Sequence, residues 1–146
     1  MIYKNYQIWY GILYIMVTIE DFKYVITPWK DSKIPDLVER DVMIDLDANK
    51  VITIAGVRRS GKTHVMFQCM NELLKKGIKS DNILYVDFEN ERIVGIRATD
   101  LDNLLVGHRE LFNPKGIAYV FLDEIQVVET GRSGSERYMI LGGTVS

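Results

Sequence analysis

The chain of 146 residues is long enough for one domain with a buried core, and 47% hydrophobic with 26% charged residues is an ordinary globular composition. A formal net charge of −2 gives no global basic field that would attract nucleic acid or an anionic membrane, but it does not exclude local basic patches. The single cysteine, Cys69, excludes an internal disulfide and suits a reducing cytosol, and no Cys/His cluster indicates zinc.

The N-terminal segment is apolar from Ile8 to Val17. This run is well short of the roughly 20 residues that a membrane-spanning helix needs, and no small-residue cleavage site follows it. It therefore predicts a packed strand or helix within an N-terminal extension, residues 1–34. We hypothesise that residues 1–15 are translated upstream sequence and that Met16 is the natural start, which a mass measurement of the native N-terminus would test.

The segment that follows, from Met16 to Asp47, is mixed in character. Turn signals stand at Thr27-Pro28-Trp29 and at Ile34-Pro35-Asp36. The sequence DLDANK then marks a further turn through its Asp and Asn residues.

From Lys50 onward, strands and helices alternate. Three apolar runs without polar alternation predict buried strands at 51–55, 82–88 and 117–122. Apolar residues at helical spacing predict helices over 61–76 and 99–112, the second with Thr99 as its N-cap. Buried strands separated by helices indicate a parallel sheet with helices on both faces, so the predicted fold class is α/β.

The octapeptide GVRRSGKT directly follows the first strand and opens the first helix, the setting in which a GxxxxGK[ST] pattern binds phosphate. Its glycines let successive backbone N–H groups point at phosphate oxygens, and the helix adds its positive N-terminal end. Lys62 is expected to reach the β- and γ-phosphates, and the Thr63 hydroxyl to ligate Mg²⁺. The predicted nucleotide-binding residues are Gly56, Val57, Arg58, Arg59, Ser60, Gly61, Lys62, Thr63 and His64.

Three of these residues keep a second interpretation. Arg58 and Arg59 are loop arginines, which are more often solvated or paired with acids than bound to nucleotide. His64 fits a surface or helix-packing role, and His108 on the second helix fits a partly buried packing role.

The third strand ends in Asp123 and Glu124, within YVFLDEIQ. Parallel sheets bind ligands at the carboxyl ends of their strands, the edge that also carries GVRRSGKT. Asp123 is expected to hold Mg²⁺, usually through water, and Glu124 to orient or activate the attacking water. Asp87 and Glu89 end the second strand at this edge, where a role at the site and a turn role both stay open.

Taken together, GVRRSGKT, VDFENERI and YVFLDEIQ resemble the archaeal and bacterial AAA-type P-loop ATPases of the AAA-14-like, DUF4143-associated family. The resemblance defines a P-loop NTPase core over residues 35–126. It implies Lys62 and Thr63 as nucleotide and Mg²⁺ contacts. It also implies Asp123 and Glu124 as the metal-binding and water-activating pair. Asn90 stands where the family has an Asp, which leaves the role of that position open.

The resemblance ends after Gln126. The family continues with a fourth strand that ends in a polar sensor residue and with an arginine finger, whereas VVETGRSGSERYMILGGTVS matches neither. A shifted reading frame after about Glu129 recovers the family's Trp-Glu and Tyr-Asp pairs at their spacing. We therefore hypothesise that residues 127–146 are an aberrant or truncated tail from a frameshifted or interrupted gene, which sequencing the locus would test.

An alternative keeps the tail in the fold. Residues 138–141 would fill the slot of the fourth strand, with Thr144 near the sensor position. Against this, the connection from Val127 to Arg137 is short for a crossover that normally carries a helix.

The predicted function is binding of Mg-ATP, with hydrolysis expected of the full-length protein. One alternative is a nucleotide-binding module without turnover, since the sensor and arginine finger are missing from the sequence; a small-molecule kinase is disfavoured by the DEIQ strand. ATP and Mg²⁺ are the expected ligands, and the expected location is cytoplasmic, without a membrane span. A homo-oligomer stays open, and no nucleic-acid or protein partner is identified.

Overall fold

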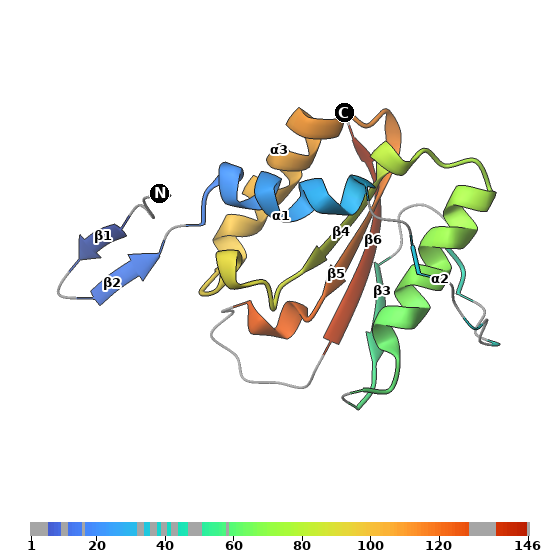
Figure 1. Ribbon diagram of the computed structural model, residues 1–146, viewed down its shortest axis with the longest axis horizontal. Helices are drawn as coiled ribbons and strands as arrows, with labels where there is room; N and C mark the ends of the chain where they lie inside the picture. The colour runs from blue at the N-terminus through green and yellow to red at the C-terminus, as the bar shows by residue number, and fades with distance from the viewer. Residues whose placement is uncertain are drawn as a thin grey trace.

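A computed structural model describes residues 6–9, 12–15, 17–31, 34–35, 38, 41, 44–46, 51–57, 59–128 and 137–145, with backbone alone for 6–9, 12–15, 31 and 137–145. The elements in chain order (Figure 1) are β1 (Tyr6–Trp9), β2 (Ile12–Ile15), α1 (Ile19–Asp31), β3 (Val51–Ala55), α2 (Lys62–Lys75), β4 (Ile83–Asp87), α3 (Leu101–Phe112), β5 (Gly116–Asp123) and β6 (Arg137–Val145). Four short 3-10 turns lie at Ser80–Asn82, Glu91–Ile93, Ala98–Asp100 and Ile125–Val127.

The main sheet has the strand order β3-β6-β5-β4. β4 and β5 are parallel, and β6 is antiparallel to both of its neighbours, so β3 runs in the same direction as β4 and β5. The three predicted strands are therefore all present and mutually parallel in direction. Their carboxyl ends lie at one edge of the sheet, which we call the C-terminal edge; the opposite one is the N-terminal edge.

β6 occupies the slot between β3 and β5 that the alternative interpretation of the tail predicted, but its direction is reversed. Its register pairs Thr144 with Ile117 at the start of β5, and Arg137 with Ala55 at the end of β3. Thr144 thus lies at the N-terminal edge, and its predicted place near the sensor position is wrong. The reversal also explains the short connection, because antiparallel neighbours need no crossover of about a dozen residues or more.

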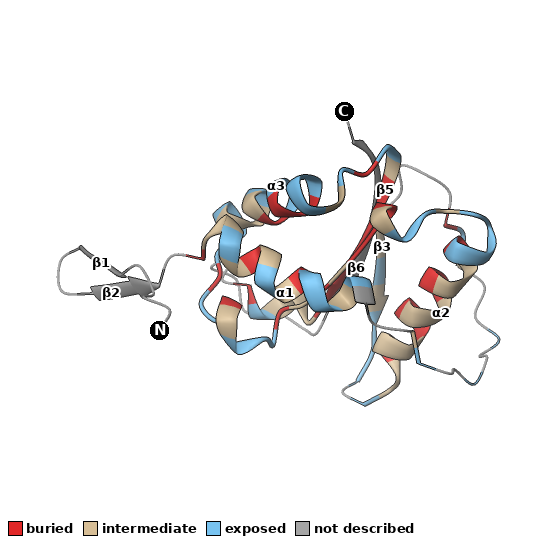
Figure 2. Cartoon of the chain, turned by 45° about the horizontal axis from the view of Figure 1, so that its top comes forward, coloured by how far each residue is buried: buried red, intermediate tan, exposed pale blue. Residues whose placement is uncertain are grey.

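Helices cover both faces of the sheet, α2 on one and α1 with α3 on the other (Figures 1 and 2). Alternate residues of β4 divide between the two sides: Ile83 and Tyr85 face α2, whereas Leu84 and Val86 face α1 and α3. Burial on both faces is the reason that the sequences of β4 and β5 lack polar alternation. The predicted burial of the strand at 51–55 is wrong, because Val51, Thr53 and Ala55 on β3 are exposed and the two residues between them are only partly buried. The α/β fold predicted from the sequence is confirmed, with one antiparallel strand added.

Helix α1 corrects the predicted turn at Thr27-Pro28-Trp29, because the helix runs through Pro28. Pro28 lies near the end of the helix, where it removes only one backbone hydrogen bond. That cost is offset by burial of Phe22 and Ile26, which are 0% and 1% exposed.

The predicted N-cap of the second helix is also wrong. Thr99 lies within the 3-10 turn Ala98–Asp100, and α3 begins at Leu101. The Asp100 carboxylate accepts a hydrogen bond from the Arg97 N–H at 3.0 Å, which closes this turn one residue beyond the expected cap. The other predicted strand and helix ends agree with the structure within two residues.

The N-terminal run predicted as a strand or helix forms an antiparallel hairpin of β1 and β2. Among the described residues, no helix combines the length and the apolar character that a membrane crossing requires.

Candidate nucleotide-binding site

The GVRRSGKT loop connects the end of β3 to the start of α2 and is curled by two left-handed residues, Arg59 (φ 63°) and Gly61 (φ 86°). The Ser60 N–H donates to the Val57 carbonyl at 3.2 Å and closes the turn between them. The space beside Gly56 is tight, since a Cβ there would lie 3.0 Å from the Ser60 Oγ, and that side chain would have to shift. Arg58 lies outside the described residues, and Arg59 is exposed.

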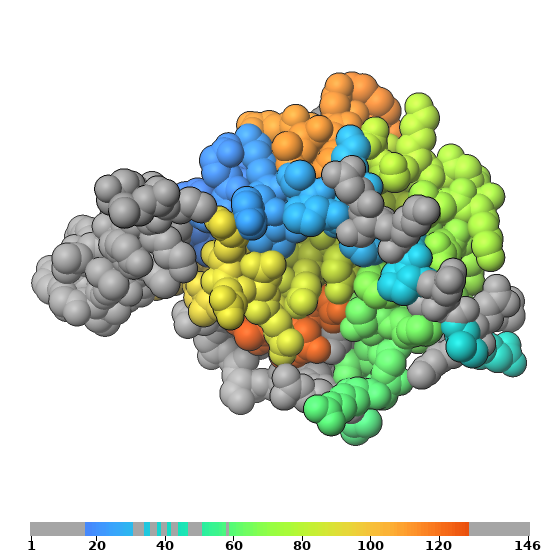
Figure 3. Space-filling view, in the orientation of Figure 1, coloured from blue at the N-terminus to red at the C-terminus, as the bar shows by residue number. Residues whose placement is uncertain are grey.

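The first turn of α2 directly follows this loop. N–H groups in the first turn of an α-helix have no partner within the helix, and Gly61 at the N-cap position offers no side chain to satisfy them. Together with the helix dipole, such groups favour an anion at this end. In the space-filling view the loop and the residues after β5 emerge at the same end of the molecule (Figure 3).

Lys62 is only 5% exposed, which is rare for a lysine. Its Nζ donates to the carbonyl oxygens of Gly56 at 2.9 Å and Val57 at 2.8 Å. These contacts hold the ammonium group over the loop instead of letting it extend into solvent. A fixed positive charge therefore lies beside the first turn of α2.

Thr63 and Asp123, sixty positions apart in the chain, meet at the C-terminal edge. The Thr63 hydroxyl donates to Asp123 Oδ2 at 2.8 Å, and the Tyr85 hydroxyl from β4 donates to the same oxygen at 2.8 Å. Asp123 is 3% exposed, and its Oδ1 is buried without a hydrogen-bond partner among the described residues. Burial raises the pKa of Asp123, which the two hydroxyl donors oppose and the carboxylates of Asp87 and Glu124 reinforce.

This arrangement fits a magnesium ion. Mg²⁺ prefers oxygen ligands and is usually held by one or two protein oxygens together with phosphates and water. Thr63 and Asp123 supply such oxygens, and the unpartnered Asp123 Oδ1 is an acceptor that native proteins rarely leave buried and unsatisfied. In the described part of the chain, no group of three His, Cys, Asp or Glu residues is placed to hold a metal ion by itself.

Glu124 follows Asp123 in the left-handed region, with φ 54° and ψ 35°. This conformation is unusual for a residue with a side chain, and such residues cluster at functional sites. The Glu124 carboxylate accepts a hydrogen bond from the Gln126 side-chain amide. Glu124 is half-buried, and it lies next to the buried carboxylate that the metal would require.

The sequence profile of the AAA domain family, AAA-14 type, matches residues 48–137, which contain the loop, the Asp123–Glu124 pair and the start of β6. The chain belongs to this AAA domain family.

Two relatives carry no described activity. An uncharacterized protein of Methanocaldococcus jannaschii is 38% identical over 98 residues, which are 67% of this chain and 20% of that protein. An uncharacterized protein of Haemophilus influenzae is 36% identical over 84 residues, which are 57% of this chain and 20% of that protein. The matched stretch thus spans about a fifth of each relative. No solved structure matches the chain.

The remaining acidic and polar candidates of this AAA domain make turns. Asp87 pairs in register with Asp123, and its Oδ1 accepts a hydrogen bond from the Glu89 N–H at 2.9 Å. Asp87 therefore has the turn role, although its charge also acts on Asp123. Asn90, which replaces the family's Asp, accepts a hydrogen bond from the Arg92 N–H at 3.0 Å and caps the next turn.

The two histidines differ. His64 is half-buried on the first turn of α2, beside the loop. His108 is 3% exposed and packs against Phe112 with ring centroids 5.3 Å apart, so the packing role predicted for it is present and its burial is greater than expected. Burial also lowers the pKa of His108, partly opposed by a hydrogen bond to the backbone of Asp81.

Sequence reasoning missed Tyr85 and Gln126. Both touch site carboxylates, yet each resembles an ordinary strand or turn residue in the sequence. The one available signal was position, because Tyr85 lies two residues before Asp87 and two-residue spacing along a strand keeps side chains on one face.

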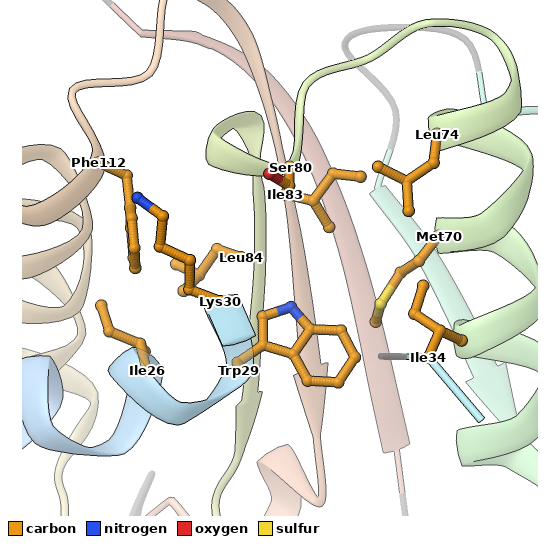
Figure 4. A pocket seen from close by; sticks show the side chains of 10 residues that line it. All are labelled: Ile26, Trp29, Lys30, Ile34, Met70, Leu74, Ser80, Ile83, Leu84 and Phe112. Carbon is orange, nitrogen blue, oxygen red and sulfur yellow. The ribbon is translucent and has the colours of Figure 1, made fainter. Parts of the chain in front are cut away.

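A separate cavity lies at the N-terminal edge of the sheet (Figure 4). It has a volume of about 60 Å³ and is walled mainly by apolar side chains from α1, α2, α3 and β4, including Trp29, Met70 and Phe112. None of the predicted nucleotide-binding or metal residues lines it.

Proposed function

We propose that this AAA domain binds Mg-ATP in the GVRRSGKT loop and hydrolyses it. The observation that carries the proposal is the 2.8 Å contact between Thr63 and Asp123. It brings the hydroxyl of the phosphate-binding loop and the buried carboxylate at the end of β5 to one point. The adjacent Asp123 Oδ1, which has no partner among the described residues, is a further acceptor there.

The loop and the start of α2 would hold the phosphates. N–H groups at the start of α2 would donate to phosphate oxygens, and the Lys62 ammonium would neutralise charge on the β- and γ-phosphates. Thr63 and Asp123 would hold Mg²⁺. When bound, the ion would supply positive charge that offsets the negative charge developing on the phosphate during transfer.

Glu124 would act on water. A carboxylate at this position can accept a proton from, or orient, the water that attacks the γ-phosphate. The Gln126 amide, which donates to the Glu124 carboxylate, would fix its orientation. We place the protein in the cytoplasm, where ATP and Mg²⁺ are available and the buried thiol of Cys69 stays reduced.

Binding without turnover is the second candidate function. The antiparallel direction of β6 favours it, since Thr144 lies at the N-terminal edge and not beside the phosphates. A homo-oligomer in which one copy completes the site of another would restore turnover, and sedimentation with and without ATP would detect it.

The test measures ATP affinity by calorimetry and phosphate release by the purified chain. Lys62→Ala removes a charge-assisted contact, and we expect a loss of affinity of about 10- to 100-fold. Lys76→Ala removes the same charge from the far end of α2 and should change nothing. Glu124→Gln should keep affinity and reduce phosphate release about 100-fold or more.

Other outcomes separate the candidates. Binding by the wild type with no phosphate release, unchanged by Glu124→Gln, would favour the module without turnover. Affinity that is unaffected by Lys62→Ala would contradict both candidates. Phosphate transfer to an added small acceptor would indicate a kinase.

A further inference from the structure

The two oxygens of Asp123 have different surroundings. Oδ2 accepts hydrogen bonds from both the Thr63 and the Tyr85 hydroxyl groups, whereas Oδ1 has no partner among the described residues. Thr63 belongs to the proposed metal site itself. Tyr85 does not, so its contact is the one that fixes the carboxylate from outside the phosphate-binding loop.

The ring of Tyr85 is in turn fixed by two other aromatic rings. Trp29 lies 4.7 Å from it and Phe67 lies 5.4 Å from it, between ring centroids. Trp29 and Phe67 also stack on each other, 5.6 Å apart with an angle of 13° between their planes. Three mutually contacting rings leave the Tyr85 hydroxyl little freedom to leave Asp123.

The three rings come from three different elements. Phe67 is one helical turn beyond Thr63 on α2, Tyr85 is on β4, and Trp29 is near the end of α1. Figure 4 shows the Trp29 indole extending from α1 toward Met70 on α2. The end of α1 is thereby connected to a proposed metal ligand through only two contacts, Trp29 to Tyr85 and Tyr85 to Asp123.

We propose that Tyr85 is a positioning residue that holds Asp123 in the orientation required for Mg²⁺, and that Trp29 makes this orientation depend on the packing of α1. This inference rests on the proposed function. Oxygen ligands of a metal are oriented by their outer hydrogen-bond partners, and loss of such a partner typically costs about 10- to 100-fold in metal affinity.

The test compares ATP affinity with and without the metal. We define the metal increment as the dissociation constant for ATP in EDTA divided by the constant in Mg²⁺. Tyr85→Phe keeps the ring and its stacking but removes the hydroxyl. We expect it to lower the metal increment about tenfold and to leave the affinity in EDTA unchanged. If Tyr85 had only a structural role, Tyr85→Phe would change the dissociation constants in EDTA and in Mg²⁺ by the same factor.

Tyr119→Phe is the matched control. Tyr119 lies on the same sheet face, in the cluster under α2, but on β5 opposite the start of β4. Removing its hydroxyl should leave the metal increment at the wild-type value. An equal loss in both variants would attribute the effect to general packing and overturn the inference.

Trp29 is tested by a pair of variants. Trp29→Leu removes both ring contacts and should lower the metal increment, by less than Tyr85→Phe because the hydroxyl remains. Trp29→Phe keeps an aromatic ring and should restore most of it, while thermal unfolding checks that both variants fold. If Trp29→Phe loses as much as Trp29→Leu, the contribution of the ring contact is contradicted.

The failures are distinguishable. If the wild type binds ATP neither in EDTA nor in Mg²⁺, the proposed function fails and this inference fails with it. If the wild type has a metal increment that Tyr85→Phe retains in full, the inference alone fails.

Discussion

The two edges of the sheet differ in how completely their polar groups are hydrogen-bonded. At the N-terminal edge, the Asn82 side-chain amide donates to the carbonyls of Lys115 and Ile117, both at 2.7 Å. The end of α2 closes there through hydrogen bonds from the Gly77 and Ile78 N–H groups. At the C-terminal edge, Asp123 has a buried oxygen without a partner among the described residues, and α2 begins without a side-chain hydrogen bond at its cap.

Backbone conformation differs between the edges in the residue types that are left-handed. At the N-terminal edge these are Gly77 and Gly116, which adopt that conformation without steric cost, and Asn113 (φ 46°), whose residue type adopts it more readily than most. At the C-terminal edge the left-handed positions include Arg59 and Glu124, which carry side chains. The N-terminal edge is thus built for stability, whereas the C-terminal edge keeps unfavourable features that a bound anion and cation would relieve.

Asn82→Ala should have the largest effect on stability. The Asn82 side chain is only 8% exposed, and its removal leaves the carbonyls of Lys115 and Ile117 without their donor. We expect the free energy of unfolding to fall by about 2–3 kcal/mol. Urea unfolding measures it, with the exposed neighbour Ser80→Ala as the control. The ATP affinity of the folded protein should stay unchanged. A large loss of affinity would contradict the separation of the two edges.

Asp123→Asn should stabilise the metal-free protein relative to the wild type as the pH rises, whereas Asn82→Ala destabilises it. Because the folded pKa of Asp123 lies above the ordinary value of 3.8, the folded state holds its proton more strongly than the unfolded chain does. Its contribution to the free energy of unfolding is therefore present below pH 3.8 and is lost as the pH rises through the folded pKa. The slope is at most about 1.4 kcal/mol per pH unit for one proton.

The measurement is urea unfolding of the metal-free protein across this pH range. Subtracting the Asp123→Asn curve from the wild-type curve isolates the residue and should give a difference that falls with rising pH. The variant should also lose the metal increment in ATP binding. A difference that rises with pH would show that the carboxylate is stabilised by its hydroxyl donors more than it is penalised by burial.

His108 is an exception to this difference between the edges. It lies near the end of α3, toward the N-terminal edge, yet its Nε2 is buried without a partner among the described residues. Its pKa is lowered from 6.5 by burial, so its contribution is present above pH 6.5 and is lost as the pH falls through the folded pKa. The wild type should therefore lose stability on acidification in this window. In His108→Leu that loss should shrink, as followed by thermal unfolding between neutral and mildly acidic pH. An unchanged pH dependence would assign the loss to other groups.

Much of this fold could be predicted because its signals are local. The apolar runs at 51–55 and 117–122 predict strands, of which 117–122 is buried and 51–55 is exposed at alternate residues. The GVRRSGKT pattern predicts a loop between a strand and a helix. The direction of the parallel strands then brings Thr63 and Asp123 to one edge. The contact between them is a consequence of topology and needs no long-range information beyond it.

What the sequence did not predict depends on packing between distant residues. Pro28 is a turn signal by itself, and only the burial of Phe22 and Ile26 makes α1 continue through it. The reversed direction of β6 is a property of the assembled sheet. The Tyr85 hydroxyl has its partner 38 positions away, so no local pattern distinguishes it from other strand tyrosines.

The smallest expected effects compare one left-handed residue at each edge. Gly77→Ala introduces a Cβ that meets no atom within 4 Å, so its cost is purely conformational, about 1 kcal/mol. Arg59→Gly removes a similar conformational cost, but it also makes the unfolded chain more flexible. The two effects largely cancel, so the free energy of unfolding should rise by less than about 0.5 kcal/mol. Urea unfolding of both variants, with ATP affinity beside it, measures the comparison. If Arg59→Gly leaves ATP affinity unchanged, the arginine is a solvated loop residue, whereas a loss of affinity without a loss of stability would assign it to the nucleotide.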